Sequence, residues 1–161
     1  NKYIIHGTFF YLTMAEDTEI YFIPIEEPRM DCVCEAVQRG IKFLDDFCKE
    51  SEDVKDVILY VWSKQAIPYY FKQSFTQDAI KILTEGKTLL GTNSKMKLES
   101  YETFNPSSDT KVIFSAYPNK KMLDAISEVI DRDAVKAVIL VNDEKQSEPW
   151  LKNWISNLEK I

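Results

Sequence analysis

Histidine is almost missing from this sequence, and glycine is scarce. His6 is the single histidine among 161 residues, so a metal site built from several histidines is excluded and any histidine-based triad must use it. We interpret His6 as a hydrogen-bonded strand residue. The four glycines lie apart and form neither a dinucleotide fingerprint nor a Walker A loop. A standard nucleotide-binding fold is therefore not expected, and we expect no cofactor and no metal.

Cysteine is also scarce, and its number is odd. Cys32, Cys34 and Cys48 all fall within one predicted helix. An odd count argues against a disulfide framework, so we expect reduced thiols and a cytoplasmic protein. One residue separates Cys32 from Cys34, whereas redox and zinc motifs use two, and we interpret both as core thiols. A thiolate nucleophile at the start of the helix is the alternative.

Long apolar segments and excess positive charge are missing as well. The apolar run at 57–62 is far shorter than the roughly 20 residues that cross a bilayer, so we expect a soluble protein. The chain begins at Asn1 without a signal-like segment, and a removed signal peptide stays an open alternative. The net charge of -6 argues against a protein that binds nucleic-acid backbones through a broad basic face.

What the sequence does contain is an alternation of strand and helix patterns. β-branched and aromatic runs predict strands at 3–12, 19–25, 57–62, 112–117 and 137–141, and a second hairpin within 87–104. Apolar residues at helical spacing predict a helix capped by Asp31, a helix from Ser74 or Thr76 to Gly86, a helix capped by Asn119, and a closing helix with Pro149 in its first turn.

This alternation predicts an α/β fold in an order of roughly ββαβα twice. Crossover connections place helices on the faces of a mixed sheet with a parallel centre, and the strands near 57, 112 and 137 lie inside it. We expect a single domain over 1–161. The similarity of 54–59 to 135–140 indicates a weak internal duplication, with candidate halves 1–86 and 87–161.

The segment 60–75 combines aromatic residues with polar ones, which is typical of contact surfaces. Because no strong catalytic motif is present, the leading hypothesis is a noncatalytic binding module, regulatory or inhibitory, that contacts a protein partner or a second copy of itself. The candidate partner-binding residues are Trp62, Tyr69, Tyr70 and Phe71, of which Tyr69 and Tyr70 beside Pro68 are expected to be the most exposed.

The alternative hypothesis is an enzyme or sensor for a small anionic or phosphorylated ligand. In parallel sheets, ligands bind beyond the carboxyl ends of the strands, where connections diverge to opposite faces. The polar residues that follow the predicted central strands are Ser63, Lys64, Tyr117, Asn119, Lys120 and Asp143. A positively charged concave pocket would favour this hypothesis, whereas an exposed apolar patch would favour the binding module.

Overall fold

The order of strands and helices along the chain follows the prediction, except that the predicted strand at 3–12 forms two antiparallel strands, at 3–5 and 9–15. The computed structural model describes residues 3–5, 9–15, 18–54, 56–106, 109–132 and 135–158, so His6 lies outside the described residues. The strands are β1 (Tyr3–Ile5), β2 (Phe9–Ala15), β3 (Thr18–Ile25), β4 (Asp56–Val61), β5 (Leu89–Leu90), β6 (Lys95–Ser100), β7 (Lys111–Ala116) and β8 (Val135–Asp143). The helices are α1 (Met30–Glu50), the 3-10 turn η1 (Lys64–Ala66), α2 (Ile67–Tyr70), α3 (Gln77–Thr84), α4 (Lys120–Arg132) and α5 (Glu144–Leu158).

One mixed sheet holds all of these strands, in the order β1-β2-β3-β8-β7-β4-β6-β5. The five strands from β3 to β6 in this order are parallel to one another, whereas β1, β2 and β5 pair antiparallel at the two edges. The predicted mixed sheet with a parallel centre is confirmed, and the strands near 57, 112 and 137 lie inside it as expected.

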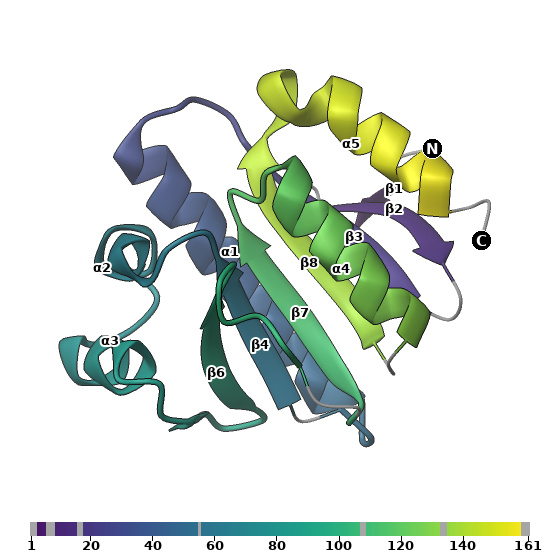
Figure 1. The fold of residues 1–161 in the computed structure, drawn as a ribbon. Coiled ribbons are helices and arrows are strands. Elements are labelled where there is room, and N and C mark those ends of the chain that lie inside the picture. Colours follow the sequence, from purple (N-terminus) through teal and green to yellow (C-terminus); the bar gives the residue numbers. More distant parts are fainter. Residues whose placement is uncertain are drawn as a thin grey trace.

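Helices cover both faces of the sheet, but they do so unequally. Figure 1 shows α4 and α5 in front of the sheet and α1 behind it. The core on the side of α1 also contains buried residues from α2 and α3, such as Ile67 and Leu83. On the opposite side, α4 and α5 pack mainly over β3, β8 and β7, and the partly buried Phe104 packs against the same core. Phe104, from the segment after β6, stacks on Tyr60 of β4 on this second face.

The predicted helix stripes face the core. Val33, Val37, Leu44 and Cys48 of α1 are buried, and Ile41 packs partly buried beside them. The stripe of α4 is also buried, and the Asn119 side chain caps this helix by accepting a hydrogen bond from the Met122 N–H (2.9 Å). Thr76 rather than Ser74 caps α3, because its hydroxyl accepts from the Ala79 N–H (3.2 Å).

Two predicted helix starts are wrong. Arg29, in extended conformation and without a side-chain capping bond, is the N-cap of α1, and Asp31 lies in the first turn, where its carboxylate lies 3.6 Å from the Arg29 guanidinium. Helix α5 begins at Glu144, directly after β8, so Pro149 lies inside the helix instead of in its first turn. A proline at that position removes one backbone donor, and the rest of the helix continues past it.

The two candidate halves do not form separate units. Strands β8 and β7, from the second half, lie between β3 and β4 of the first half. In a duplicated fold, the pair β3 and β4 of the first half would correspond to the pair β7 and β8 of the second half. Strands β7 and β8 are direct neighbours, whereas two strands separate β3 from β4, so the two halves are not arranged alike in the sheet. Within the described ranges, no helix is both long and apolar enough to cross a membrane.

Gly40 lets α1 approach the sheet closely. A Cβ atom at this position would lie 2.6 Å from a carbon of the Phe114 ring and 2.9 Å from Cδ1 of Ile23. Both of these side chains are fully buried, so neither can move away without disturbing the core.

We predict that Gly40→Ala lowers the free energy of unfolding by about 1 kcal/mol. Helix propensity alone would stabilise this change by about 1 kcal/mol, whereas overpacking in a dense core costs about 1 to 3 kcal/mol. Chemical denaturation measures the difference, with exposed Lys42→Ala in the same helix as the control. A rise in stability for Gly40→Ala would contradict the close packing of α1 on β3 and β7.

Candidate functional site

A groove of about 600 Å³ lies at the carboxyl ends of β4 and β6. After β4 the chain turns toward the face that α1 covers, whereas after β6 it crosses the opposite face to reach β7. Such divergence at neighbouring parallel strands is where α/β sheets form ligand sites. The lining residues come from both strand ends: Trp62, Ser63, Lys64, Gln65, Ser100, Tyr101, Glu102 and Thr103. We call this set the aromatic groove.

Two stacked rings form the apolar part of the aromatic groove. The ring centroids of Trp62 and Tyr101 lie 4.8 Å apart with an angle of 19° between the planes. The strand ends hold them side by side, because the Tyr101 N–H donates to the Trp62 carbonyl oxygen (3.4 Å). Trp62 is 48% exposed and Tyr101 is 37% exposed. Large apolar area therefore faces solvent in a fixed orientation.

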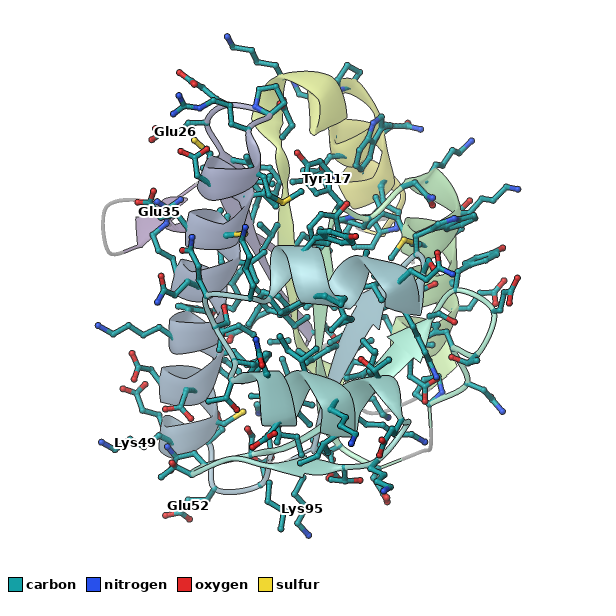
Figure 2. The ribbon with its side chains drawn as sticks, turned by 90° about the vertical axis from the view of Figure 1, so that its left-hand side faces the viewer. Glu26, Glu35, Lys49, Glu52, Lys95 and Tyr117 are labelled. Carbon is teal, nitrogen blue, oxygen red and sulfur yellow. The ribbon has the colours of Figure 1, made fainter. Side chains whose placement is uncertain are left out.

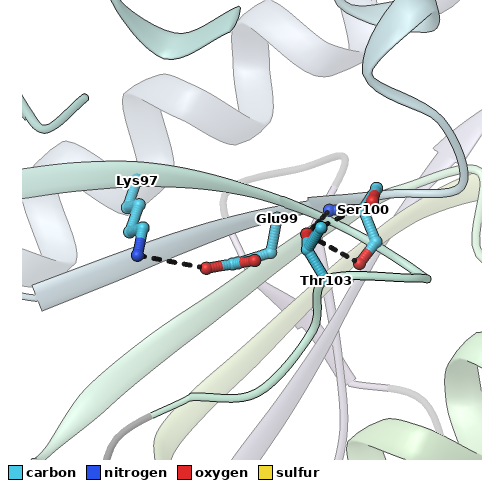
Figure 3. Close-up of polar contacts among 4 residues, drawn as sticks. All are labelled: Lys97, Glu99, Ser100 and Thr103. Carbon is cyan, nitrogen blue, oxygen red and sulfur yellow. Dashed lines mark hydrogen bonds and ion pairs between the residues drawn. The ribbon is translucent and has the colours of Figure 1, made fainter. Parts of the chain in front are cut away.

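The polar wall of the groove is held by short-range hydrogen bonds. The Ser100 N–H donates to the Thr103 hydroxyl (3.0 Å), and the Thr103 N–H donates to the Ser100 carbonyl oxygen (3.1 Å). Figure 3 shows this turn together with the ion pair of Lys97 and Glu99 (3.4 Å) on the same strand. On the opposite wall, the Ser63 hydroxyl accepts from the Gln65 N–H (3.3 Å). Both walls are thus ordered by the chain itself.

Tyr60 lies beside the groove in the core and carries an unusual hydroxyl. Its ring stacks on Phe104 with centroids 3.9 Å apart, and the residue is fully buried. In the described part of the chain its hydroxyl has no hydrogen-bond partner. Burial, with a smaller contribution from nearby Tyr101, raises the pKa of the Tyr60 phenol well above its usual value, so it stays protonated.

We predict that Tyr60→Phe raises the free energy of unfolding by about 1 kcal/mol. A buried hydroxyl without a partner costs about 1 to 3 kcal/mol of desolvation, and the substitution removes it while keeping the ring. The matched control is Tyr21→Phe, where the hydroxyl donates to Glu19 (2.9 Å) and its loss should lower stability. Destabilisation by Tyr60→Phe, measured by urea denaturation, would show that the hydroxyl does have a partner.

The structure separates the four predicted partner-binding residues. Trp62 and Tyr69 are exposed, Tyr69 with 60% of its surface. Tyr70 is half-buried against Tyr117, with ring centroids 5.6 Å apart. Phe71 is fully buried and packs on Phe114 in the core, so its predicted place on a contact surface does not fit the structure. The reason is helical spacing, because the turn of α2 places residue 71 above buried Ile67.

The six predicted ligand-site residues lie at the carboxyl ends of three strands. Ser63 and Lys64 line the aromatic groove, whereas Tyr117, Asn119, Lys120 and Asp143 follow or end β7 and β8 and are outside its lining. Figure 2 shows Tyr117 at the end of the molecule where Glu26 lies, opposite Lys95 at the start of β6.

Tyr117 has a left-handed backbone with φ of 55°. Its N–H donates to the Val141 carbonyl oxygen (2.7 Å), which holds this conformation between β7 and β8. Burial first, then the neighbouring Asp143 and Tyr70, raises the pKa of the Tyr117 phenol. Asp143 itself is buried, and Asn142 bonds the Pro118 carbonyl oxygen (2.8 Å). These contacts form a well-ordered strand end whose carboxylate does not favour an anionic ligand.

The cysteines have structural surroundings. None of the three forms a disulfide. Cys34 is buried and its Sγ donates to the Tyr69 carbonyl oxygen (3.0 Å), which links α1 to α2. Burial raises the pKa of the Cys34 thiol, so its surroundings oppose a thiolate nucleophile. Cys32 is half-buried with the Arg29 guanidinium 3.5 Å away. Among the described residues, no three His, Cys, Asp or Glu side chains group as metal ligands.

Sequence reasoning missed five of the eight residues that line the aromatic groove. Gln65, Ser100, Tyr101, Glu102 and Thr103 line it and were not predicted as site residues. Ser100 ends β6 and the next three residues follow it, and the sequence contains no local signal that places this strand beside β4. The aromatic Tyr101 within a polar run was the one available hint.

Comparisons with known proteins add no assignment. No family model matches the chain, and searches of curated proteins and of solved structures also find no match. The site's own geometry therefore carries the functional argument.

Proposed function

We propose that this chain is a noncatalytic binding module that contacts a protein partner through the aromatic groove. The observation that carries the proposal is the exposed, stacked pair of Trp62 and Tyr101. Tryptophan and tyrosine are enriched among residues whose truncation costs an interface 2 kcal/mol or more. The pair contributes its stacking to the fold, but about half of the indole surface remains for a partner to cover.

Tyr69 extends the proposed contact surface onto α2. Its side chain is exposed while its carbonyl oxygen is held by Cys34, so the residue has a fixed position and a free ring face. The three cysteines form no disulfide, which supports a reducing compartment, and we place the module in the cytoplasm on that basis. The partner is a different protein or a second copy of this chain.

A second candidate function is the binding of a small anionic ligand at the strand ends. The left-handed backbone of Tyr117 supports it, because such conformations concentrate at functional sites. Charge does not support it, since Lys64 is accompanied in the groove by Glu102, and Asp143 lies buried at the end of β8. We therefore rank this function below the binding module.

We predict that Trp62→Ala weakens partner binding by about 30-fold while changing the free energy of unfolding by less than about 1.5 kcal/mol. The 30-fold loss of binding corresponds to about 2 kcal/mol, which is typical of an interface anchor. The small change in stability corresponds to the loss of one stacked aromatic pair. The measurement is quantitative pull-down from a lysate of the source cell, with Tyr69→Ala as a second variant. Sedimentation of the same variants tests self-association.

The control variant is Leu90→Ala. Leu90 is the most exposed large apolar residue in the described ranges, at 73%, and lies in β5 away from the groove lining. It should retain full partner recovery. Equal recovery by the wild type, Trp62→Ala and Tyr69→Ala would contradict the proposed function and would favour the anionic-ligand function instead.

A further inference from the structure

The chemistry of the aromatic groove indicates which kind of partner segment it takes. Its walls are ordered before any ligand arrives, through the Ser100–Thr103 turn and the Ser63 cap of η1. Its two rings are already stacked on each other, and both residues are partly exposed. A preformed groove loses little conformational entropy on binding and selects a segment that is itself stiff.

Addition of a partner strand to the sheet is blocked at this groove. Strand β6 is near the sheet edge, but β5 pairs with its first residues, Lys95 and Met96. At the other end of β6, the Ser100 N–H donates to the Thr103 hydroxyl, and the Ser100 carbonyl oxygen accepts from the Thr103 N–H. Strand addition needs a row of open backbone groups along the edge. A partner segment here must be recognised by rings and side chains instead of by a backbone ladder.

The charges of the groove do not select a charged segment. Its lining has one cation, Lys64, and one anion, Glu102. The nearby pair of Lys97 and Glu99 is also balanced. The remaining polar groups include the Gln65 amide, the Ser63 hydroxyl, the Trp62 indole N–H and the Tyr101 hydroxyl, all of which can donate to carbonyl oxygens.

A proline-rich segment in the polyproline II conformation meets these conditions together. It is stiff, it has no internal hydrogen bonds, and its carbonyl oxygens remain available as acceptors. Proline has no N–H, so such a segment needs no acceptors along a strand edge. Its apolar rings pack on aromatic side chains, which is the known mode of recognition in aromatic-lined grooves.

We infer that the aromatic groove binds a neutral, proline-rich segment of the partner protein, packed against Trp62 and Tyr101. This inference rests on the proposed function and makes it more specific. The groove volume of about 600 Å³ lies within the roughly 300 to 1,000 Å³ of preformed ligand sites. A segment in this conformation turns once in about 9 Å, so a short stretch is enough to contact both walls.

The test uses fluorescein-labelled decaproline and measures fluorescence anisotropy as the full chain is added. We expect saturable binding with a Kd below about 1 mM for the wild type and for Leu90→Ala. Trp62→Ala and Tyr101→Ala should each weaken binding at least about 10-fold, which corresponds to about 1.4 kcal/mol. Thermal melting of each variant confirms that it is folded, and Trp62→Phe, which keeps a ring, should weaken binding less than Trp62→Ala does.

Peptides of equal length define the chemistry. A Gly-Ser decapeptide should not bind, and any binding of decalysine, which the net charge of -6 favours across the surface, should not depend on Trp62. Decalysine binding that depends on Trp62, equal binding of the Gly-Ser peptide, or decaproline binding that does not depend on Trp62 would overturn the inference.

Different results would contradict the inference and the proposed function. If decaproline does not bind below about 1 mM but partner recovery from the lysate still requires Trp62, the groove takes another kind of segment and the inference is wrong. If neither decaproline binding nor partner recovery depends on Trp62, the proposed function is wrong as well.

Discussion

The handedness of crossover connections determines how the faces of this sheet are covered. Connections between parallel strands are right-handed, so their direction across the sheet decides which face each helix occupies. The chain moves from β3 to β4 and on to β6 in one direction, which places α1, α2 and α3 on one face. It moves from β7 to β8 in the opposite direction, which places α4 on the other face. No described helix remains to cover β4 and β6 on that second face.

Aromatic side chains occupy the place that a helix would otherwise take. Phe104 covers Tyr60, and Tyr101 stacks on Trp62, so the residues that follow β6 protect the end of β4. This cover is thin, because it comes from a loop and leaves the Trp62 indole half exposed. The same feature thus explains the stacked pair, the groove and the Tyr60 hydroxyl, which has no hydrogen-bond partner among the described residues. The strand order and the directions of the connections are therefore enough to account for the groove.

Much of the fold could be predicted because its signals are local. The stripe of Val33, Val37 and Leu44 specifies a helix, and the apolar run at 57–62 specifies a buried strand. The burial of Phe71 could also have been predicted, since it lies four residues after Ile67 and the two share one side of a helical turn. The start of α1 at Arg29 could not be predicted, because this N-cap residue makes no side-chain capping bond.

The site was harder to predict, because strand order is a long-range property. Trp62 was identified from its own segment, but its stacking partner Tyr101 directly follows β6, whose last residue, Ser100, lies opposite Val61 although the two are far apart in the sequence. Neither composition nor periodicity indicates that β6 lies beside β4 in the sheet. Of the polar residues that follow central strands, Ser63 and Lys64 reach the groove and the others do not, for the same reason.

The central claim is that a partner covers Trp62 while the core stays unchanged. Fluorine NMR of the chain labelled with fluorotryptophan gives one resonance for each of the three tryptophans, and Trp62→Phe identifies its own. On addition of the partner recovered by pull-down, the account predicts that the Trp62 resonance shifts and loses its solvent isotope effect, while the resonance of buried Trp154 stays in place. A Trp62 resonance that does not change in the saturated complex would contradict the account.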